Sequence, residues 1–150
     1  MLKILDLSAG KRGIWFNKNH PAVVYVDHRA AVHPAICCDT RCLPLAVGTG
    51  YSLVVFDPPH VNVGANSNLS RDYGHSTTKQ IQDLVLLTAI EAHRVTVPDA
   101  LMAFKWNDHD QRLTKIMDLV RYWWEPLFGH MVSERSMRAS RTYWVMLRRR

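Results

Sequence analysis

Residues 51–60 read Tyr-Ser-Leu-Val-Val-Phe-Asp-Pro-Pro-His, and this stretch decides both the fold class and the position of the candidate site. The apolar, β-branched run over 51–56 predicts a buried strand. Asp57 ends that strand, and the two prolines after it fix two φ angles and remove two backbone donors. We therefore expect Asp57 to project from the carboxyl end of a buried strand, where open α/β sheets bind their ligands.

The tetrapeptide Asp57-Pro58-Pro59-His60 has the chemistry to hold an amino group. A carboxylate and a rigid proline carbonyl can together accept both hydrogens of one amine. The planar His60 side chain can stack on the ring that carries the amine. A proline-stiffened turn after a strand is the alternative interpretation.

Strand and helix patterns alternate along the rest of the chain. The predicted strands cover 2–7, 22–26, 36–38, 51–56 and 100–104, and the predicted helices cover 14–17, 30–33, 78–94 and 112–123. Two last strands, 127–132 and 142–147, are joined by a connection with no room for a helix. This order predicts an α/β fold with a mostly parallel sheet flanked by helices, a C-terminal antiparallel hairpin strand and a single domain over 1–150.

The first predicted strand leads into a glycine-containing turn. The stretch Leu5-Asp6-Leu7-Ser8-Ala9-Gly10 ends the strand, and Gly13 follows three residues later. Glycines at such a turn let a ligand approach the backbone closely, although many α/β turns need glycine for the turn alone.

Two more carboxylates follow the next predicted strands. Asp27, with His28 beside it, ends the second strand about twenty residues after the first strand. At this spacing a carboxylate can accept hydrogen bonds from both hydroxyls of a bound ribose. Asp39, followed by Thr40, comes after the third strand and can accept a hydrogen bond from an adenine amino group. An N-cap role for Asp27 and an ordinary turn role for Asp39 remain open.

Together these segments resemble the class I S-adenosylmethionine-dependent methyltransferases, most closely the amino-methyltransferases of DNA adenine N6 and cytosine N4. The resemblance implies a Rossmann-like methyltransferase fold with S-adenosyl-L-methionine as cofactor. It assigns cofactor binding to Asp6, Ser8, Ala9, Gly10, Gly13, Asp27, His28, Asp39, Thr40 and Asp57. It assigns catalysis to Asp57, Pro58, Pro59 and His60. The chain departs from the family pattern at His60, where an aromatic residue is usual, and at Lys11, where a small residue is usual.

The implied function is methylation of an exocyclic base amino group, with adenine N6 in DNA as the first candidate. An RNA base, adenine N6 or guanine N2, is an alternative because RNA offers unpaired targets to a minimal domain. The alternative from a different functional class is a subunit that binds the cofactor but has no catalytic activity.

Charge and a long polar segment bear on the substrate. Nineteen Lys and Arg against thirteen Asp and Glu give a formal charge of +6, which favours a polyanionic partner such as DNA or RNA. The resemblance implies DNA before RNA. A duplex base must be flipped out to react, and we expect the loop 61–78 to hold it through Arg71 and Tyr73. Lys105 is predicted to contact a phosphate and Trp106 to stack. A surface connection, and a core tryptophan beside a lysine that reaches solvent, are the alternatives.

The remaining expectations concern the cysteines, the cellular location and the oligomeric state. Cys37, Cys38 and Cys42 are predicted to be free, at least partly buried thiols in a reducing compartment, and no metal site is expected. Because no leader pattern or apolar run long enough for a membrane span is seen, we expect a cytoplasmic protein without a membrane partner. A homodimer that builds a substrate groove is one alternative to a monomer.

Overall fold

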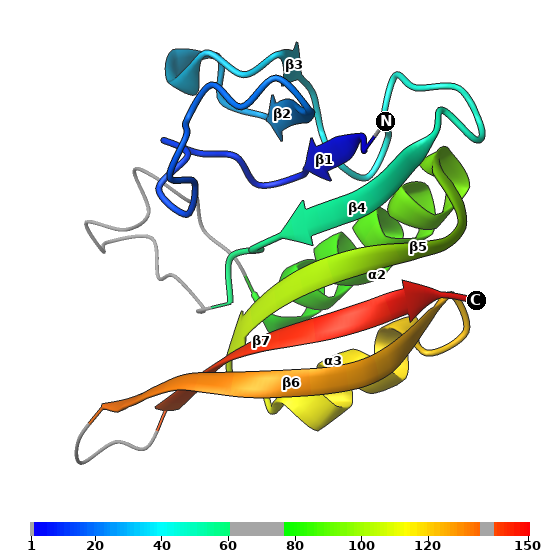
Figure 1. Ribbon diagram of the computed structural model, residues 1–150. Coiled ribbons are helices and arrows are strands. Elements are labelled where there is room, and N and C mark those ends of the chain that lie inside the picture. Colours follow the sequence, from blue (N-terminus) through cyan, green and yellow to red (C-terminus); the bar gives the residue numbers. More distant parts are fainter. Residues whose placement is uncertain (1, 61–76, 136–139) are drawn as a thin grey trace.

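The computed structural model describes residues 2–60, 77–135 and 140–150, and these form one seven-stranded sheet in the order β3-β2-β1-β4-β5-β7-β6 (Figure 1). Its strands, in chain order, are β1 (Ile4–Asp6), β2 (Val23–Asp27), β3 (Ile36–Cys37), β4 (Tyr51–Phe56), β5 (Thr96–Asn107), β6 (Trp124–Arg135) and β7 (Ser140–Arg149).

The strand directions confirm the predicted α/β class. Parallel pairing joins β3 to β2, β2 to β1, β1 to β4 and β4 to β5. The last strand, β7, inserts antiparallel between β5 and β6. The carboxyl ends of β1, β2, β4 and β5 therefore lie along one edge of the sheet.

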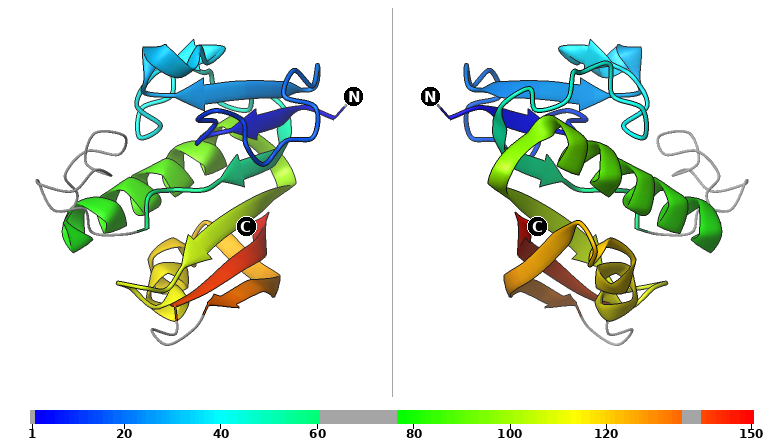
Figure 2. Two further views of the ribbon diagram at one scale, coloured as in Figure 1. Left: turned by 90° about the vertical axis from the view of Figure 1, so that its left-hand side faces the viewer. Right: turned by 90° about the vertical axis from the view of Figure 1, so that its right-hand side faces the viewer.

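Two helices cover one face of this sheet. The crossover from β4 to β5 contains α2 (Thr78–Val95), and the crossover from β5 to β6 contains α3 (Leu113–Val120). Figures 1 and 2 show both helices on the same side. The main core fills the space between them and the sheet, and its largest buried side chains are Trp106, Trp124, Phe56 and Phe104. Neither helix, nor any other in the described residues, is long and apolar enough to cross a membrane.

The opposite side of the sheet, named the outer face here, has only local cover. Over β1 and β2 the connection between these strands lies on it, and Trp15 contacts Tyr25 edge to face at 5.8 Å between ring centroids. No helix in the described part of the chain covers β5, β7 and β6 on this face (Figures 1 and 2).

The short helix expected at 14–17 is wrong, because the β1–β2 connection consists of turns. Arg12 adopts a left-handed φ of 56°, and its guanidinium donates to the Lys18 carbonyl at 2.8 Å and to the His33 carbonyl at 3.1 Å. The same group lies 4.1 Å from the centroid of the Tyr25 ring. These distant partners hold an irregular backbone that a local pattern does not reveal.

The other predicted elements are found, and apart from β4 their ends differ from the prediction. The brief helix at 30–33 is the 3-10 turn η1 (Ala30–Val32). The fifth strand is longer than expected, since β5 begins directly after α2, and the helix predicted over 112–123 ends earlier, at Val120. The early start of β5 follows from the pairing of Thr96 with Tyr51 of β4, and after α3 the chain joins β7 from Trp124 onward, so both ends follow from tertiary pairing rather than from local pattern.

Candidate functional site

Three carboxylates lie at the carboxyl ends of three neighbouring parallel strands. Asp6 is the last residue of β1 and Asp27 the last of β2, while Asp57 follows β4 directly. In the register, Asp6 is opposite Tyr25 on one side and Val55 on the other. Asp27 lies two positions beyond Tyr25, and Asp57 lies two positions beyond Val55. Alternate residues of a strand share a face. The topology therefore brings all three to the outer face at one edge.

The turn after β1 is fastened to both neighbouring strands. The Leu7 amide donates to the Val55 carbonyl at 2.9 Å, and the Ala9 amide donates to the Val26 carbonyl at 3.1 Å. The Asp57 amide donates to the Ser8 hydroxyl at 2.6 Å, which joins this turn to the start of the Asp-Pro-Pro-His segment.

Gly10 occupies the tightest point of that turn. Its φ is +49°, a left-handed conformation that glycine adopts without steric cost, and a Cβ there would lie 3.4 Å from Nη2 of Arg29. A side chain at position 10 would thus meet the Arg29 guanidinium. At Gly13, by contrast, an added Cβ would have no neighbouring atom within 4 Å, so this position does not restrict side-chain size.

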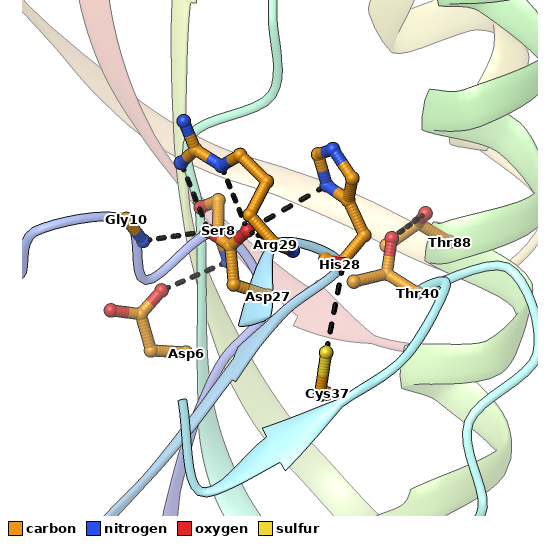
Figure 3. Close-up of polar contacts among 9 residues, drawn as sticks. All are labelled: Asp6, Ser8, Gly10, Asp27, His28, Arg29, Cys37, Thr40 and Thr88. Carbon is orange, nitrogen blue, oxygen red and sulfur yellow. Dashed lines mark hydrogen bonds and ion pairs between the residues drawn. The ribbon is translucent and has the colours of Figure 1, made fainter. Parts of the chain in front are cut away.

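Asp27 is the most heavily bonded of the three acids (Figure 3). Its Oδ2 accepts from the Gly10 amide at 2.8 Å and from Nη2 of Arg29 at 3.1 Å. Its Oδ1 accepts from the Arg29 amide at 2.9 Å and from Nε of Arg29 at 3.0 Å. Burial raises the pKa of Asp27, but the bonds from Arg29 and Gly10 outweigh burial and leave this pKa below its ordinary value.

Asp6 has the opposite electrostatic character. Its side chain is 1% exposed and accepts hydrogen bonds from Nε1 of Trp15 at 2.7 Å and from the Ser8 amide at 3.1 Å. Burial is the largest effect and raises its pKa to about 6, against the lowering effect of those two bonds, with smaller increases from Asp57 and Asp27. Asp6 is thus a buried acid that titrates close to neutrality.

The Asp57 carboxylate is paired with Lys105 of β5. The Lys105 ammonium lies 2.7 Å from Oδ2 of Asp57, and the two side chains are 27% and 23% exposed. His60 turns back so that its Nδ1 lies 3.1 Å from the Pro58 carbonyl oxygen, and its ring meets Trp106 edge to face at 6.1 Å. Both groups expected to receive an amine therefore already have a partner within the chain.

The residues after β3 divide between surface and core. Hydrogen bonds from the Arg41 guanidinium lower the pKa of Asp39, whose Oδ2 lies 2.6 Å from Nη2 of Arg41. Thr40 is buried, and its hydroxyl is 2.9 Å from the Thr88 hydroxyl of α2 (Figure 3). Thr40 thus fastens this loop to α2 and does not face the acids. His28 is 70% exposed beside Asp27, with 3.6 Å between Nδ1 and Oδ1.

The residues predicted to bind the substrate do not lie together in the structure. Trp106 is 0% exposed, and its Nε1 donates to the Gln111 carbonyl at 2.8 Å, so it is a core residue as in the alternative interpretation. Lys105, its neighbour in β5, points to the outer face and contacts Asp57. Arg71 and Tyr73, with most of the predicted loop 61–78, lie outside the described residues.

Sequence reasoning missed Trp15, Arg29 and the pairing of Lys105 with Asp57. For Arg29 a signal was present, because Asp27-His28-Arg29 and Asp39-Thr40-Arg41 share the pattern Asp-x-Arg after successive strands. In both cases the arginine amide and its guanidinium bind the same aspartate two residues earlier.

The cysteines and histidines form no metal site in the part of the chain that the structure describes. All three thiols are free, but Cys37 and Cys42 are exposed, contrary to the expected burial, and only Cys38 is partly buried.

A scan of protein-family models and a search of curated proteins find no match to this chain. Solved structures do match its fold. N-methyltransferase NodS from Bradyrhizobium japonicum, in complex with S-adenosyl-L-homocysteine, aligns with a TM-score of 0.63 and 10% identity over 99% of this chain and 78% of that chain. A TehB-like SAM-dependent methyltransferase from Corynebacterium glutamicum aligns with a TM-score of 0.66 and 13% identity over 99% and 80%.

The cyclase SpnF aligns comparably, with a TM-score of 0.66 and 10% identity over 98% of this chain and 75% of that chain. These similarities confirm the predicted Rossmann-like methyltransferase fold. Because one matching structure is a cyclase, the choice of reaction has to come from the site.

The Asp6 carboxyl gives the folding stability a distinctive pH dependence. It takes up its proton near pH 6 in the folded chain and near its ordinary pKa of 3.8 in the unfolded chain. Between those values the native state binds more protons, so the free energy of unfolding falls as pH rises through this window. Asp6→Asn lacks this titration. In urea denaturation, the free energy of unfolding of Asp6→Asn minus that of wild type should therefore rise by about 3 kcal/mol between about pH 4 and pH 7. Parallel pH profiles of the two proteins would contradict the assignment.

Proposed function

We propose that this chain is an S-adenosylmethionine-dependent methyltransferase that acts on an exocyclic amino group of a nucleic-acid base, with adenine N6 in DNA as the first candidate. The observation that carries the proposal is the position of Asp57. It lies on the same edge and the same face as Asp6 and Asp27, and its amide is bonded to Ser8 in the glycine turn.

The residues at this edge fit the cofactor. Carboxylates suit ribose hydroxyls and the positive charges of the cofactor's amino-acid end, and the turn at Gly10 lacks the Cβ that would meet Arg29. Asp27 would hold the ribose, Ser8, Ala9 and Gly10 the amino-acid end, and Asp39 the adenine. S-adenosylmethionine, when bound, supplies an electrophilic methyl group on a sulfonium. The comparison with NodS supports this choice, since that structure holds S-adenosyl-L-homocysteine.

Asp57 would orient the attacking amine. An aromatic amino nitrogen is a poor nucleophile because its lone pair is delocalised into the ring, and a hydrogen bond to a fixed acceptor helps it pyramidalise. Lys105 binds Oδ2 of Asp57 and leaves Oδ1 as the acceptor. The same ammonium balances the carboxylate charge, so Asp57 acts as an orienting acceptor, with orientation supplying much of the acceleration.

The Pro58 carbonyl oxygen has two lone pairs, and His60 can occupy only one of them. It can therefore accept the second amine hydrogen while His60 stays in place. His60 in turn rests on the buried Trp106, which limits the orientations available to its ring. The proton that the amine loses would leave to solvent.

The nucleic-acid class rests on the formal charge of +6 and on the chemistry of the Asp-Pro-Pro-His segment. Contacts from Arg71 and Tyr73 to the extruded nucleotide remain part of this proposal. A non-catalytic cofactor-binding subunit is less favoured, because the Asp57–Lys105 pair places a charge-balanced acceptor where an amine would react.

Replacing Asp57 separates catalysis from cofactor binding. Asp57→Ala should reduce transfer of labelled methyl groups at least about a hundredfold, because the amine loses its fixed acceptor, while binding of S-adenosyl-L-homocysteine by calorimetry stays measurable. Separate DNA, RNA and protein pools identify the acceptor. The matched control is Asp118→Ala, an exposed acid of α3. Undiminished turnover in Asp57→Ala would refute the role of Asp57, and label only in protein would refute the substrate class.

Replacing Arg29 tests the ribose site. The bonds to Asp27 occupy all of about four acceptor positions on its two oxygens. A ribose can bind only if one bond is exchanged, and the guanidinium is more easily moved than the two backbone amides. Arg29→Gln should therefore bind S-adenosyl-L-homocysteine about tenfold more tightly in calorimetry. Arg121→Gln, at an exposed position directly after α3 and away from the site, is the control for lost positive charge. Weaker binding in Arg29→Gln alone would show that Arg29 helps to hold the cofactor.

A further inference from the structure

The outer face of β5, β7 and β6 continues directly from Asp57. Lys105 is opposite Trp144 in the register, and Trp144 is opposite His130. Directly paired residues of antiparallel strands lie on the same face. These three side chains therefore form a row across three strands, and the row begins at the residue that binds Asp57.

A second row lies beside the first. Ala103 is opposite Met146, and Met146 is opposite Phe128. Phe128 is 67% exposed and Trp144 and Met146 are partly exposed, so aromatic and apolar surface faces outward. We name the six residues of both rows the aromatic platform: Lys105, Trp144, His130, Ala103, Met146 and Phe128.

The platform is physically continuous with the candidate site. The Lys105 ammonium lies 2.7 Å from Oδ2 of Asp57 and 5.9 Å from the centroid of the Trp144 ring. One cation thus bridges the orienting carboxylate and the first aromatic ring. A molecule whose reactive part reaches Asp57 can therefore place its neighbouring part on Trp144.

The net charge of the C-terminal segment suits a polyanion. Residues 135–150 contain six arginines and no acidic residue. Of these, Arg148 is exposed on β7 two positions from Met146, on the same face, where it pairs with Glu125 at 2.6 Å. Trp144 of β7 and Phe128 of β6 face outward, and the charged residues of β7 itself are all basic. The hairpin therefore combines the two features that bind nucleic-acid strands: stacking surfaces and cations for the phosphates.

We propose that the aromatic platform binds a single-stranded stretch of nucleic acid next to the target base, with bases stacked on Trp144 and Phe128. This inference rests on the proposed function and specifies its substrate class. A single strand is favoured over a duplex because rings on a sheet face can stack only on bases that are already exposed. The strand would enter across β6 and β7 and deliver its target amine to Asp57 over Lys105.

Binding of short fluorescent single-stranded DNA and RNA, followed by anisotropy, tests the platform. Trp144→Ala and Phe128→Ala should each weaken binding about tenfold, the usual effect of removing one stacking partner. Tyr122→Ala is the matched control, since Tyr122 is 71% exposed after α3 and outside the platform. Trp144→Phe keeps a ring and should bind within a few-fold of wild type, and it stays informative if Trp144→Ala folds poorly.

The result separates three outcomes. If the platform variants lose strand affinity but no base is ever methylated, the platform stands and the proposed function fails. If the variants bind single strands as tightly as wild type, the platform is overturned even where methylation occurs. If wild type is a dimer by light scattering and Phe128→Asp makes it monomeric without changing strand affinity, a second copy covers this face and the inference is also overturned.

Discussion

Parallel pairing of β1 with both β2 and β4 is the constraint on which the rest of the site depends. That register sets Asp27 and Asp57 each two residues beyond the partners of Asp6, and so brings three carboxylates to one face at one edge. Such crowding is unfavourable unless the charges are compensated. Arg29 compensates Asp27 and Lys105 compensates Asp57, while burial raises the pKa of Asp6 to about 6, so that Asp6 keeps its proton to a higher pH than an ordinary aspartate.

These pairs imply that the site is assembled before a ligand arrives. The same pairs also set how a ligand can bind: on Asp27 it has to replace a bond from Arg29, and on Asp57 it meets Oδ1, because among the described residues Lys105 binds Oδ2. Preformed acceptors of this kind lose little freedom when they meet an amine, which is the physical basis for orientation as the main catalytic effect in the proposed function. The open sheet face that begins at Lys105 is the direction of approach that we propose for the substrate.

Much of the fold could be predicted because local and global signals agree. The run over 51–56 is the strand β4 with the same ends, since apolar residues lead into two prolines that cannot continue a strand. The turn at 11–19 could not be predicted, because Arg12 is held by carbonyls of Lys18 and His33. For Lys105 and Trp106, alternation shows that they face opposite ways, but only the placement of the two helices shows which side is core.

The central claim is that Asp57 shares a binding site with the methyl donor. A crystal structure of this chain with S-adenosyl-L-homocysteine tests it most directly. We predict the ribose on Asp27 and the thioether sulfur turned toward Asp57, with Lys105 still bound to its other oxygen. A nucleoside bound elsewhere, or a sulfur facing away from Asp57, would contradict the account.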